Sequence, residues 1–418
     1  MRRANGWMRC LALACMSMLA TGAARAGETE IVARSLVNQG STARLEHAMA
    51  KARRGEPVTF GVIGGSITEG AGANPREQNR WANLVWDWWK ATYPEAQINY
   101  VNAGIGATGS DYGVFRLERD LLHENPDVVV VEFAVNDVNT RASAETLEGI
   151  VRQVLAQPNQ PAVLLYFCMN NRGENAQPWF SKVGEHYGLP MVSYRDALWP
   201  EVAAKRIAFS DITADTIHPN NRGHRYAADF LIALLKPVAN RLPADATLPA
   251  IPPVPEPLFT DVYAHTAMHE FGWAKKEKNF RPARVEGKWF LHGESWLCDT
   301  PGAVVEFSVS GDLIYLQHDK TSSFFAPKVE VRVDDRAPQI IDCYWAYPFT
   351  AAFTSLIGKD LGPGPHTVSL KLLAEKNPKC PAPPENAPFT HRFSLQRIFA
   401  AGAGSEHEVA AERRLAED

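Results

Sequence analysis

The sequence predicts an α/β domain built on a parallel sheet, followed by an all-β domain. Between residues 41 and 241, apolar strand-like runs alternate with helical patterns, which is the arrangement of strand–helix–strand units in a parallel sheet. After a segment rich in proline, the helical period disappears. Short strand-like runs separated by Gly, Asp and Pro turns follow, as in a β-sandwich.

Five runs are the expected strands of the first domain. They are VTFGVI, INYVNAG, DVVVVEF, AVLLYF and LPMVSY, which begin at Val58, Ile98, Asp127, Ala162 and Leu189. The third is an unbroken apolar run, which is typical of a strand buried on both faces of a sheet. The segment NRGHRYAADFLIALLKPVANRL predicts the helix that closes the series.

Composition and the N-terminus limit the possible functions. The chain is 45% hydrophobic with a formal net charge of −4, so no basic surplus favours nucleic acid or an anionic membrane. Arg2, Arg3, the apolar run CLALACMSMLA and a small-residue site ending at Ala26 predict a signal peptide. No second apolar run is long enough for a membrane span. We therefore expect a secreted or periplasmic protein without stable membrane association.

The expected organisation has five parts. These are a signal peptide at residues 1–26, the α/β domain at 27–241, a proline-rich linker at 242–258, the sandwich at 259–400 and a disordered tail at 401–418. A stiff linker of this kind predicts few contacts between the two domains.

The sandwich is a candidate carbohydrate-binding domain because its aromatic side chains include some that could face sugar rings, although most are expected in its core. The aromatics are Trp289, Trp296, Tyr344, Trp345 and Tyr347. An exported protein permits disulfides, but their pairing does not follow from the sequence. The cysteines beyond the signal peptide are Cys168, Cys298, Cys343 and Cys380.

The first strand ends in Gly64, Gly65 and Ser66, at the sheet edge where open α/β sheets bind ligands. Two glycines permit a tight turn with no side chain in the way. Thr68 stands where the nucleophile elbow G-x-S-x-G has its last glycine, and no Gly-Lys-Ser/Thr of a phosphate loop follows. Ser66 is therefore either a nucleophile or a turn serine that caps a helix.

A base for this serine lies in the segment DTIHP. The spacing of Asp215 and His218 lets the carboxylate hold the imidazole Nδ1–H and leaves Nε2 for Ser66. His224 is a rival base, but its place inside the next helix favours packing. A metal site of Asp211, Asp215 and His218 is disfavoured because no other convincing ligand cluster exists, so we expect neither metal nor cofactor.

Acyl transfer also needs hydrogen-bond donors for the oxyanion. The segment NAGIGATG follows the second strand with small residues whose backbone N–H groups can approach a substrate. Asn136, in FAVNDVN after the third strand, can offer its side-chain amide. Its alternative role is that of a turn residue bonded to its own backbone.

Taken together, GGSIT, NAGIGATG, VEFAVND and DTIHP resemble the four blocks of the SGNH (GDSL-like) hydrolase superfamily, over roughly residues 41–235. The resemblance implies a three-layer α/β/α, flavodoxin-like domain. It implies that Ser66 is the nucleophile and an oxyanion donor through its own N–H. Asn136 is then the side-chain donor, His218 the base and Asp215 its partner.

The chain departs from the family pattern at three positions. Gly65 replaces the usual Asp before the serine, and Ala134 replaces the glycine before the block-three Asn-Asp. Ala107 aligns with the glycine donor of block two, with Gly106 adjacent. Because a backbone amide can serve from either residue, both are candidate oxyanion donors.

The superfamily includes lipases, thioesterases, lysophospholipases and carbohydrate O-acetylesterases. The fold alone does not indicate which of these activities the chain has. The expected arrangement, an exported chain with a sandwich after a proline linker, resembles that of bacterial polysaccharide-active esterases. It favours a serine esterase that removes O-acetyl groups from polysaccharide or oligosaccharide. The alternatives are an exported small-ester or lipid hydrolase, a periplasmic glycan O-acetyltransferase, and a binding protein without activity. The oligomeric state does not follow from the sequence.

Overall fold

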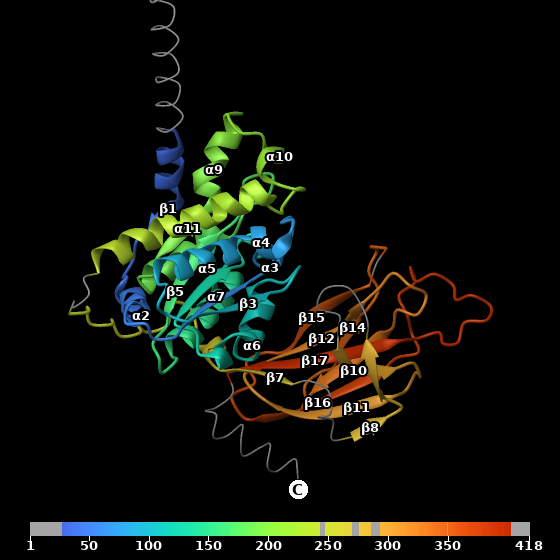
Figure 1. Cartoon of the computed structure of the whole chain (residues 1–418). Helices are drawn as coiled ribbons and strands as arrows, with labels where there is room; N and C mark the ends of the chain where they lie inside the picture. The colour runs from blue at the N-terminus through green and yellow to red at the C-terminus, as the bar shows by residue number, and fades with distance from the viewer. Residues whose placement is uncertain (1–26, 243–246, 270–275, 286–292, 349, 403–418) are drawn as a thin grey trace, which may run out of the picture. The chain divides into compact units, whose positions relative to one another are not determined.

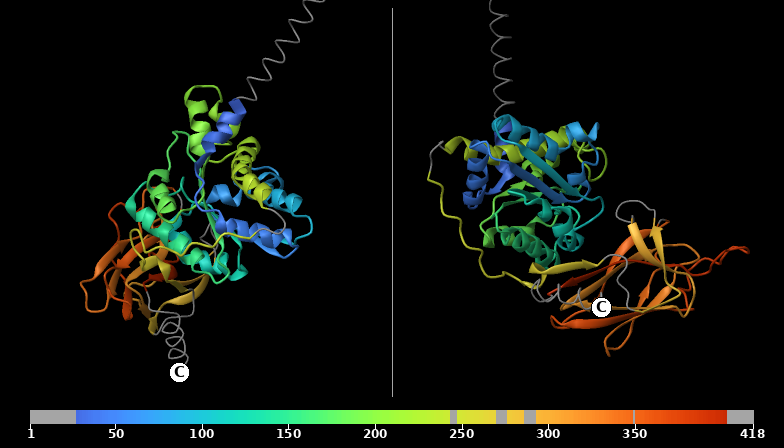
Figure 2. Two further views of the ribbon diagram at one scale, coloured as in Figure 1. Left: turned by 90° about the vertical axis from the view of Figure 1, so that its left-hand side faces the viewer. Right: turned by 60° about the horizontal axis from the view of Figure 1, so that its bottom comes forward.

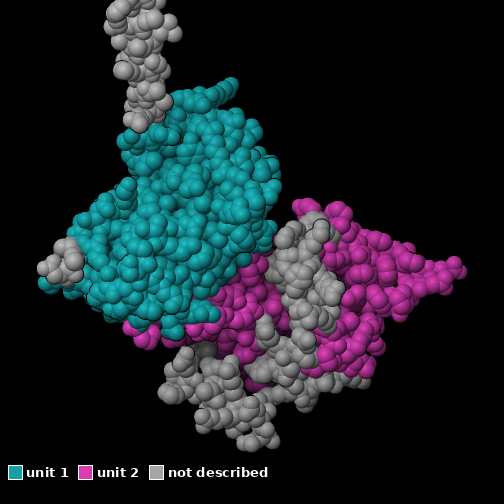
Figure 3. All heavy atoms as spheres, viewed as in Figure 1, with its two compact units in different colours: residues 1–104, 124–140, 159–253 teal, residues 105–123, 141–158, 254–418 magenta. Residues whose placement is uncertain are grey.

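The computed structural model describes residues 27–242, 247–269, 276–285, 293–348 and 350–402. The predicted signal peptide, nearly all of the predicted tail, part of the linker and Trp289 lie outside the described residues. The chain divides into two compact units, coloured separately in Figure 3. The first holds residues 1–104, 124–140 and 159–253, and the second holds residues 105–123, 141–158 and 254–418.

The first unit is built on a mostly parallel sheet (Figure 1). Its strand order is β1-β6-β5-β4-β2-β3, and only β1 pairs antiparallel with its neighbour. All five predicted strands are present. The strands are β1 (Leu36–Asn38), β2 (Val58–Gly64), β3 (Ile98–Gly104), β4 (Val128–Glu132), β5 (Ala162–Phe167) and β6 (Met191–Ser193).

Helices of this unit follow β1, β2, β5 and β6, and the last of them matches the predicted closing helix. The helices that follow β3 and β4 belong to the second unit. Those of the first unit are α2 (Ala43–Arg53), α3 (Ser66–Glu69), α4 (Arg76–Asn79), α5 (Trp81–Thr92), α8 (Gln177–His186), α9 (Tyr194–Ala203), α10 (Phe209–Ile212) and α11 (Asn221–Arg241). A short 3₁₀ helix, η1 (Leu122–Glu124), precedes β4 where the chain passes from the second unit back to the first.

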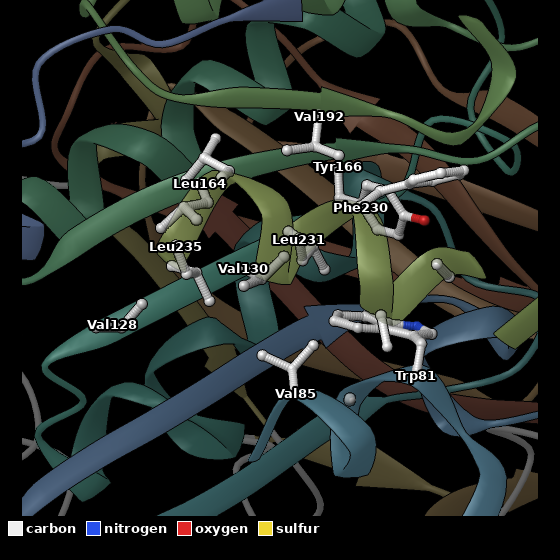
Figure 4. Close-up of a cluster of buried hydrophobic side chains, with 14 of the residues drawn as sticks. Trp81, Val85, Val128, Val130, Leu164, Tyr166, Val192, Phe230, Leu231 and Leu235 are labelled. Atoms are coloured by element: carbon white, nitrogen blue, oxygen red, sulfur yellow. The ribbon is translucent and has the colours of Figure 1, made fainter. Parts of the chain in front are cut away.

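A hydrophobic core joins one face of this sheet to α5 and α11. Every second residue of the central strands points into it, as period-two side-chain geometry requires, and the alternate residues of these strands are buried as well. Burying a large apolar side chain contributes about 1.5–3 kcal/mol. Figure 4 shows part of this core: Val128 and Val130 of β4, Leu164 and Tyr166 of β5, Trp81 and Val85 of α5, and Phe230, Leu231 and Leu235 of α11.

The second unit contains two antiparallel sheets that share one hydrophobic core, which is a β-sandwich. One sheet has the order β15-β12-β17-β10-β9 with β7 beside β17, and the other has the order β14-β13-β16-β11-β8; Figure 2 gives two further views of the strands. Their bounds are β7 (Thr266–His269), β8 (Lys276–Lys278), β9 (Arg281–Val285), β10 (Gly293–Cys298), β11 (Val304–Ser310), β12 (Leu313–Lys320), β13 (Lys328–Val333), β14 (Gln339–Asp342), β15 (Ala351–Gly358), β16 (Pro365–Leu372) and β17 (Phe393–Ala401). The predicted fold class, an α/β domain followed by antiparallel β-sheets, is confirmed.

Two helices of the predicted α/β domain pack against the sandwich, α6 (Ser110–Asp120) and α7 (Arg141–Leu155). Phe115 of α6 stacks on Phe399 of β17 with ring centroids 4.9 Å apart. The buried Glu148 carboxylate of α7 accepts the backbone N–H groups of Phe259 at 2.9 Å and Thr260 at 3.2 Å. The expectation of few contacts across the linker is therefore wrong for these helices, and the domain boundaries themselves stay predictions.

Candidate active site

Ser66 begins α3 directly after the turn that ends β2. A Cβ at Gly64 would collide with the Thr68 hydroxyl and with the backbone carbonyl oxygen of Glu132, so the turn requires glycine there. Gly65 donates its N–H to the same carbonyl oxygen at 3.3 Å. The two glycines thus let the chain turn closely against β4, which brings Ser66 to the carboxyl edge of the sheet.

The structure brings Ser66, His218 and Asp215 together. Ser66 Oγ lies 2.8 Å from His218 Nε2, and His218 Nδ1 lies 2.7 Å from Asp215 Oδ2. This is the chain of contacts through which a serine can pass its proton to an imidazole oriented by a carboxylate. The Asp215 carboxylate and the His218 imidazole are thus in contact, as their spacing predicts, and their catalytic roles stay predictions.

The loop between α10 and α11 fixes the Asp215–His218 pair. The Asp215 Oδ1 atom accepts the backbone N–H groups of Ile217 and His218, both at 2.8 Å. Ala214 N–H donates to the His218 carbonyl oxygen at 2.8 Å. Burial works to raise the pKa of the Asp215 carboxyl, but the bonds from His218 and Ile217 outweigh it, so the pKa is lowered. Asp215 is therefore held as the carboxylate.

His224 is buried in α11 and serves a different purpose. The Trp81 backbone N–H donates to its Nδ1 at 3.3 Å, so its Nε2–H donates to the Ala71 carbonyl oxygen at 3.1 Å. Burial lowers the pKa of this imidazole to about 4. Because backbone groups occupy both ring nitrogens, His224 is a packing residue that ties α11 to the segment after α3.

Asn136 lies four residues beyond the end of β4, the strand that pairs with β2. Its backbone N–H donates to the Phe133 carbonyl oxygen at 3.0 Å. Its side chain is exposed and makes no hydrogen bond within the described part of the chain. The turn-residue alternative requires a side-chain bond to nearby backbone, so this geometry favours an amide available to a substrate.

Gly106 and Ala107 lie in the loop between β3 and α6, at the start of the second unit. Ala107 has φ of 60°, in the left-handed region that favours glycine. This backbone conformation supports the alignment of Ala107 with the family's block-two glycine. Both residues stay predicted oxyanion donors.

Three further features bear on the sequence predictions. Among the described residues, no group of three or more His, Cys, Asp or Glu side chains is placed to hold a metal ion. The helices described here include none with the length and apolar character of a membrane span. The four described cysteines, Cys168, Cys298, Cys343 and Cys380, are free thiols.

Comparisons with known proteins identify the family. The model of the GDSL-like lipase/acylhydrolase family matches residues 62–226. A solved two-domain esterase active on acetylated mannans is 31% identical with a TM-score of 0.78, and the match covers 90% of this chain and 99% of that chain. The chain belongs to the GDSL-like lipase/acylhydrolase family. It is a carboxylic ester hydrolase.

A second structure of that esterase and one further relative of this GDSL-like hydrolase add detail. The same two-domain esterase co-crystallised with mannopentaose matches with a TM-score of 0.77, 31% identity and the same coverage of 90% and 99%. Thioesterase 1/protease 1/lysophospholipase L1 of Escherichia coli (strain K12) is 26% identical over 190 residues, which are 44% of this chain and 85% of that protein.

The polar groups behind Ser66, the predicted nucleophile of this hydrolase, were not predicted from the sequence. Glu132, the last residue of β4, is completely buried, and the Thr68 hydroxyl donates to its Oε2 atom at 3.0 Å. The Asn102 side-chain amide donates to the Thr68 carbonyl oxygen at 2.8 Å. The signal was present, because an acid at the end of the run VVVVE interrupts an apolar strand just before Asn136.

Proposed function

We propose that this hydrolase removes O-acetyl groups from a polysaccharide or oligosaccharide through an acetyl-enzyme on Ser66. The likeness to the two-domain esterase active on acetylated mannans carries the proposal, because it covers 90% of this chain and therefore includes the sandwich. A likeness confined to the α/β domain would leave the acyl group and the alcohol open.

In the first half of the reaction, Ser66 Oγ attacks the acetyl carbonyl carbon and His218 Nε2 takes the hydroxyl proton. Asp215 stabilises the resulting imidazolium through the bond at Nδ1. The tetrahedral intermediate collapses when the bond to the sugar oxygen breaks. The leaving sugar oxygen takes the proton back from His218, and the acetyl group stays on Ser66.

In the second half, water replaces the sugar. His218 takes a proton from the water, whose oxygen attacks the acetyl carbon. When the second intermediate collapses, the bond to Ser66 Oγ breaks, this oxygen takes the proton back from His218, and acetate is released. The negative oxygen of both intermediates needs preorganised donors. We assign these to the Ser66 N–H and the Asn136 amide, with Ala107 or Gly106 as the predicted third donor.

The sandwich offers an aromatic surface for glycan. Tyr347 is 62% exposed, and its ring centroid lies 5.0 Å from that of Trp345, which in turn packs edge-on against Phe353 at 4.9 Å. An exposed aromatic face suits the apolar C–H face of a sugar ring. Of the other predicted aromatics, Trp296 is in the sandwich core and Tyr344 is partly buried.

The proposed location is outside the cytoplasm. Its support is the pattern of Arg2, Arg3, the apolar run and the small residues ending at Ala26. A polymer substrate fits this location because intact polysaccharide does not reach the cytoplasm. N-terminal sequencing of the protein from its native host should find a start near Gly27; a mature protein that retains Met1 contradicts the proposal.

The deciding experiment measures acetate release from acetylated mannan, acetylated xylan and p-nitrophenyl acetate, beside a lysophospholipid and an acyl thioester. The Ser66→Ala protein is the blank. We expect turnover of at least one acetylated glycan to exceed that of the lipid and thioester by tenfold or more in kcat/KM. Preference for the lysophospholipid or thioester rejects the proposal in favour of the activities named for the E. coli relative.

A second assay separates hydrolysis from transfer. The enzyme receives acetylated donor together with an unacetylated oligosaccharide, and acetate and newly acetylated oligosaccharide are both quantified. We expect free acetate to dominate. Acetylated oligosaccharide as the main product would replace the hydrolase by a glycan O-acetyltransferase that uses the same serine.

A further inference from the structure

Glu132 sits directly behind the turn that carries the nucleophile. Its backbone carbonyl oxygen accepts the Gly65 N–H, and its carboxyl accepts the Thr68 hydroxyl at 3.0 Å. Thr68 is two residues beyond Ser66 in α3, and Asn136 is four residues beyond Glu132. One residue therefore contacts the nucleophile turn on both sides of Ser66 and belongs to the segment that carries Asn136.

The surroundings of this carboxyl favour its neutral form. Glu132 is completely buried, and among the described residues no Lys, Arg or His side chain pairs with it. The titratable groups near it are the Cys168 thiol, the Tyr166 hydroxyl and the Asp137 carboxylate, none of which supplies a positive charge. Burial raises the pKa of Glu132 to about 8, although the Thr68 and Cys168 bonds act in the opposite direction.

We propose that Glu132 is a positioning residue for Ser66 and that it does this work only while its carboxyl is neutral. The inference rests on the proposed function only in taking Ser66 as the nucleophile. The neutral carboxyl holds Thr68, and through it α3, against β4 without placing a charge in the core. Asn102 holds the Thr68 carbonyl oxygen from β3, so Thr68 is anchored to both strands that flank β2.

Ionisation of Glu132 has two costs. An unpaired buried carboxylate requires solvation that the closed packing around it does not offer, so the site must loosen where α3 meets β4. The charge also lies on the nucleophile turn, close to where negative charge develops on the substrate oxygen, and like charge opposes the transition state. Both effects lower kcat as pH rises through the pKa of Glu132.

The first test is the pH dependence of kcat on p-nitrophenyl acetate, corrected for spontaneous hydrolysis. With a pKa of about 8, the wild-type kcat at pH 9 is expected to be about tenfold below its value at pH 7. Glu132→Gln keeps an acceptor for Thr68 and cannot ionise, so this alkaline loss should disappear. A folded Glu132→Gln protein that keeps the wild-type alkaline loss overturns the proposal, as does a wild type without one.

A matched control comes from the sandwich. Asp319 is also largely buried, with a pKa that burial raises to about 7, and it contacts no predicted catalytic residue. Asp319→Asn should leave the pH profile of kcat unchanged. If it removes the alkaline loss as Glu132→Gln does, the loss reflects global stability and the proposal fails.

Substitutions of Thr68 keep the proposal testable where Glu132→Gln does not fold. The Thr68 hydroxyl lowers the pKa of Glu132, so Thr68→Val should move the alkaline loss to higher pH and lower kcat by about tenfold. Thr68→Ser keeps the hydroxyl and should restore the wild-type profile. A purely structural Thr68 would lower kcat without moving the profile, and that result rejects the linkage to Glu132.

Failure of this inference and failure of the proposed function give different results. A small ester is used throughout, so the identity of the natural glycan has no influence. If Ser66→Ala keeps near-wild-type turnover, the mechanism itself is wrong. If Ser66→Ala is inactive while Glu132→Gln keeps the wild-type pH profile, only the role of Glu132 is rejected.

Discussion

Each compact unit buries a histidine and a carboxylic acid, and the two pairs have different partners. In the α/β unit, His224 bonds to Ala71 and Trp81, and Glu132 bonds to Thr68. In the sandwich, His318 bonds to the Ser355 hydroxyl at 2.9 Å and to the Asp319 carbonyl oxygen at 3.1 Å, while the Asp319 carboxylate accepts the Gln396 amide.

The two pairs differ in the elements to which their hydrogen-bond partners belong. In the α/β unit, Thr68 lies in α3, Ala71 in the turn after it and Trp81 at the start of α5. Their bonds therefore tie the segments around Ser66 to β4 and α11. The partners in the sandwich belong to β12, β15 and β17 of a single sheet. Buried polar groups of the same kind thus order the segments around Ser66 in one unit and the pairing of neighbouring strands in the other.

The largest effect is expected from removing Ser66 or His218, the predicted nucleophile and base. Ser66→Ala and His218→Ala should each lower kcat on p-nitrophenyl acetate by about 10⁴-fold or more, and the double variant should be no worse than either single one. His318→Gln, in the sandwich, should leave kcat unchanged. Additive losses in the double variant would show that the serine and the imidazole do not act as one unit.

The next effect concerns Asn136. Because an oxyanion donor acts as charge develops, Asn136→Ala should lower kcat by about 10²–10³-fold with little change in KM. Asn139→Ala, an exposed asparagine three residues further on, is the matched control and should behave as wild type. A variant that mainly raises KM would mark Asn136 as a ground-state contact instead.

The parallel sheet could be predicted from the sequence because each central strand is long, apolar and bounded by glycine or polar residues. The sequence did not predict β1, whose three residues pair antiparallel with β6 at the sheet edge, because so short a run carries no period. It also did not predict α9, whose pattern is interrupted by Pro200. A local sequence pattern does not predict an element whose formation depends on pairing with a segment that is distant in the sequence.

The candidate site shows the same limit. Ser66, His218 and Asp215 were predicted because four segments at one sheet edge resemble the four blocks of a known superfamily, although a turn serine or a D-x-x-H pair is uninformative by itself. Glu132 was not predicted, because its role depends on Thr68 from another part of the chain. The docking of α6 on the sandwich was missed for the same reason: an amphipathic helix predicts a buried face without saying that Phe115 will meet Phe399.

A third prediction compares the acid stability that the two buried histidines confer. Burial lowers the pKa of both His224 and His318 to about 4, so both are neutral in the folded protein while the unfolded chain binds protons below about pH 6.5. The contribution of each neutral histidine to the free energy of unfolding is therefore fully present above pH 6.5. It is lost as pH falls toward 4, by on the order of a few kcal/mol for each histidine.

The midpoint of urea unfolding, measured at pH 7 and at pH 5, tests this prediction. His224→Gln keeps an acceptor for the Trp81 N–H and a donor for Ala71, and it cannot titrate, so its midpoint should depend less on pH than that of the wild type. His318→Gln should flatten the dependence in the same way through the Ser355 contact. An unchanged pH dependence in either variant would mean that the histidine concerned is hydrated or charged in the folded protein.

The smallest expected effect tests whether the sandwich takes part in substrate binding. The full chain is the proper protein for this, because removal of the sandwich would expose Phe115 and leave the buried Glu148 carboxylate without its backbone donors. Tyr347→Ala should raise KM for acetylated polymer by a few-fold while kcat/KM for p-nitrophenyl acetate stays unchanged.

Ile340→Ala changes an exposed apolar residue of β14 (51% exposed) and is the control for loss of apolar surface without an aromatic face. Equal effects of the two substitutions would remove the reason for assigning glycan contact to the aromatic surface. A loss on the small ester as well would mean that Tyr347 acts on the catalytic region and not on the polymer.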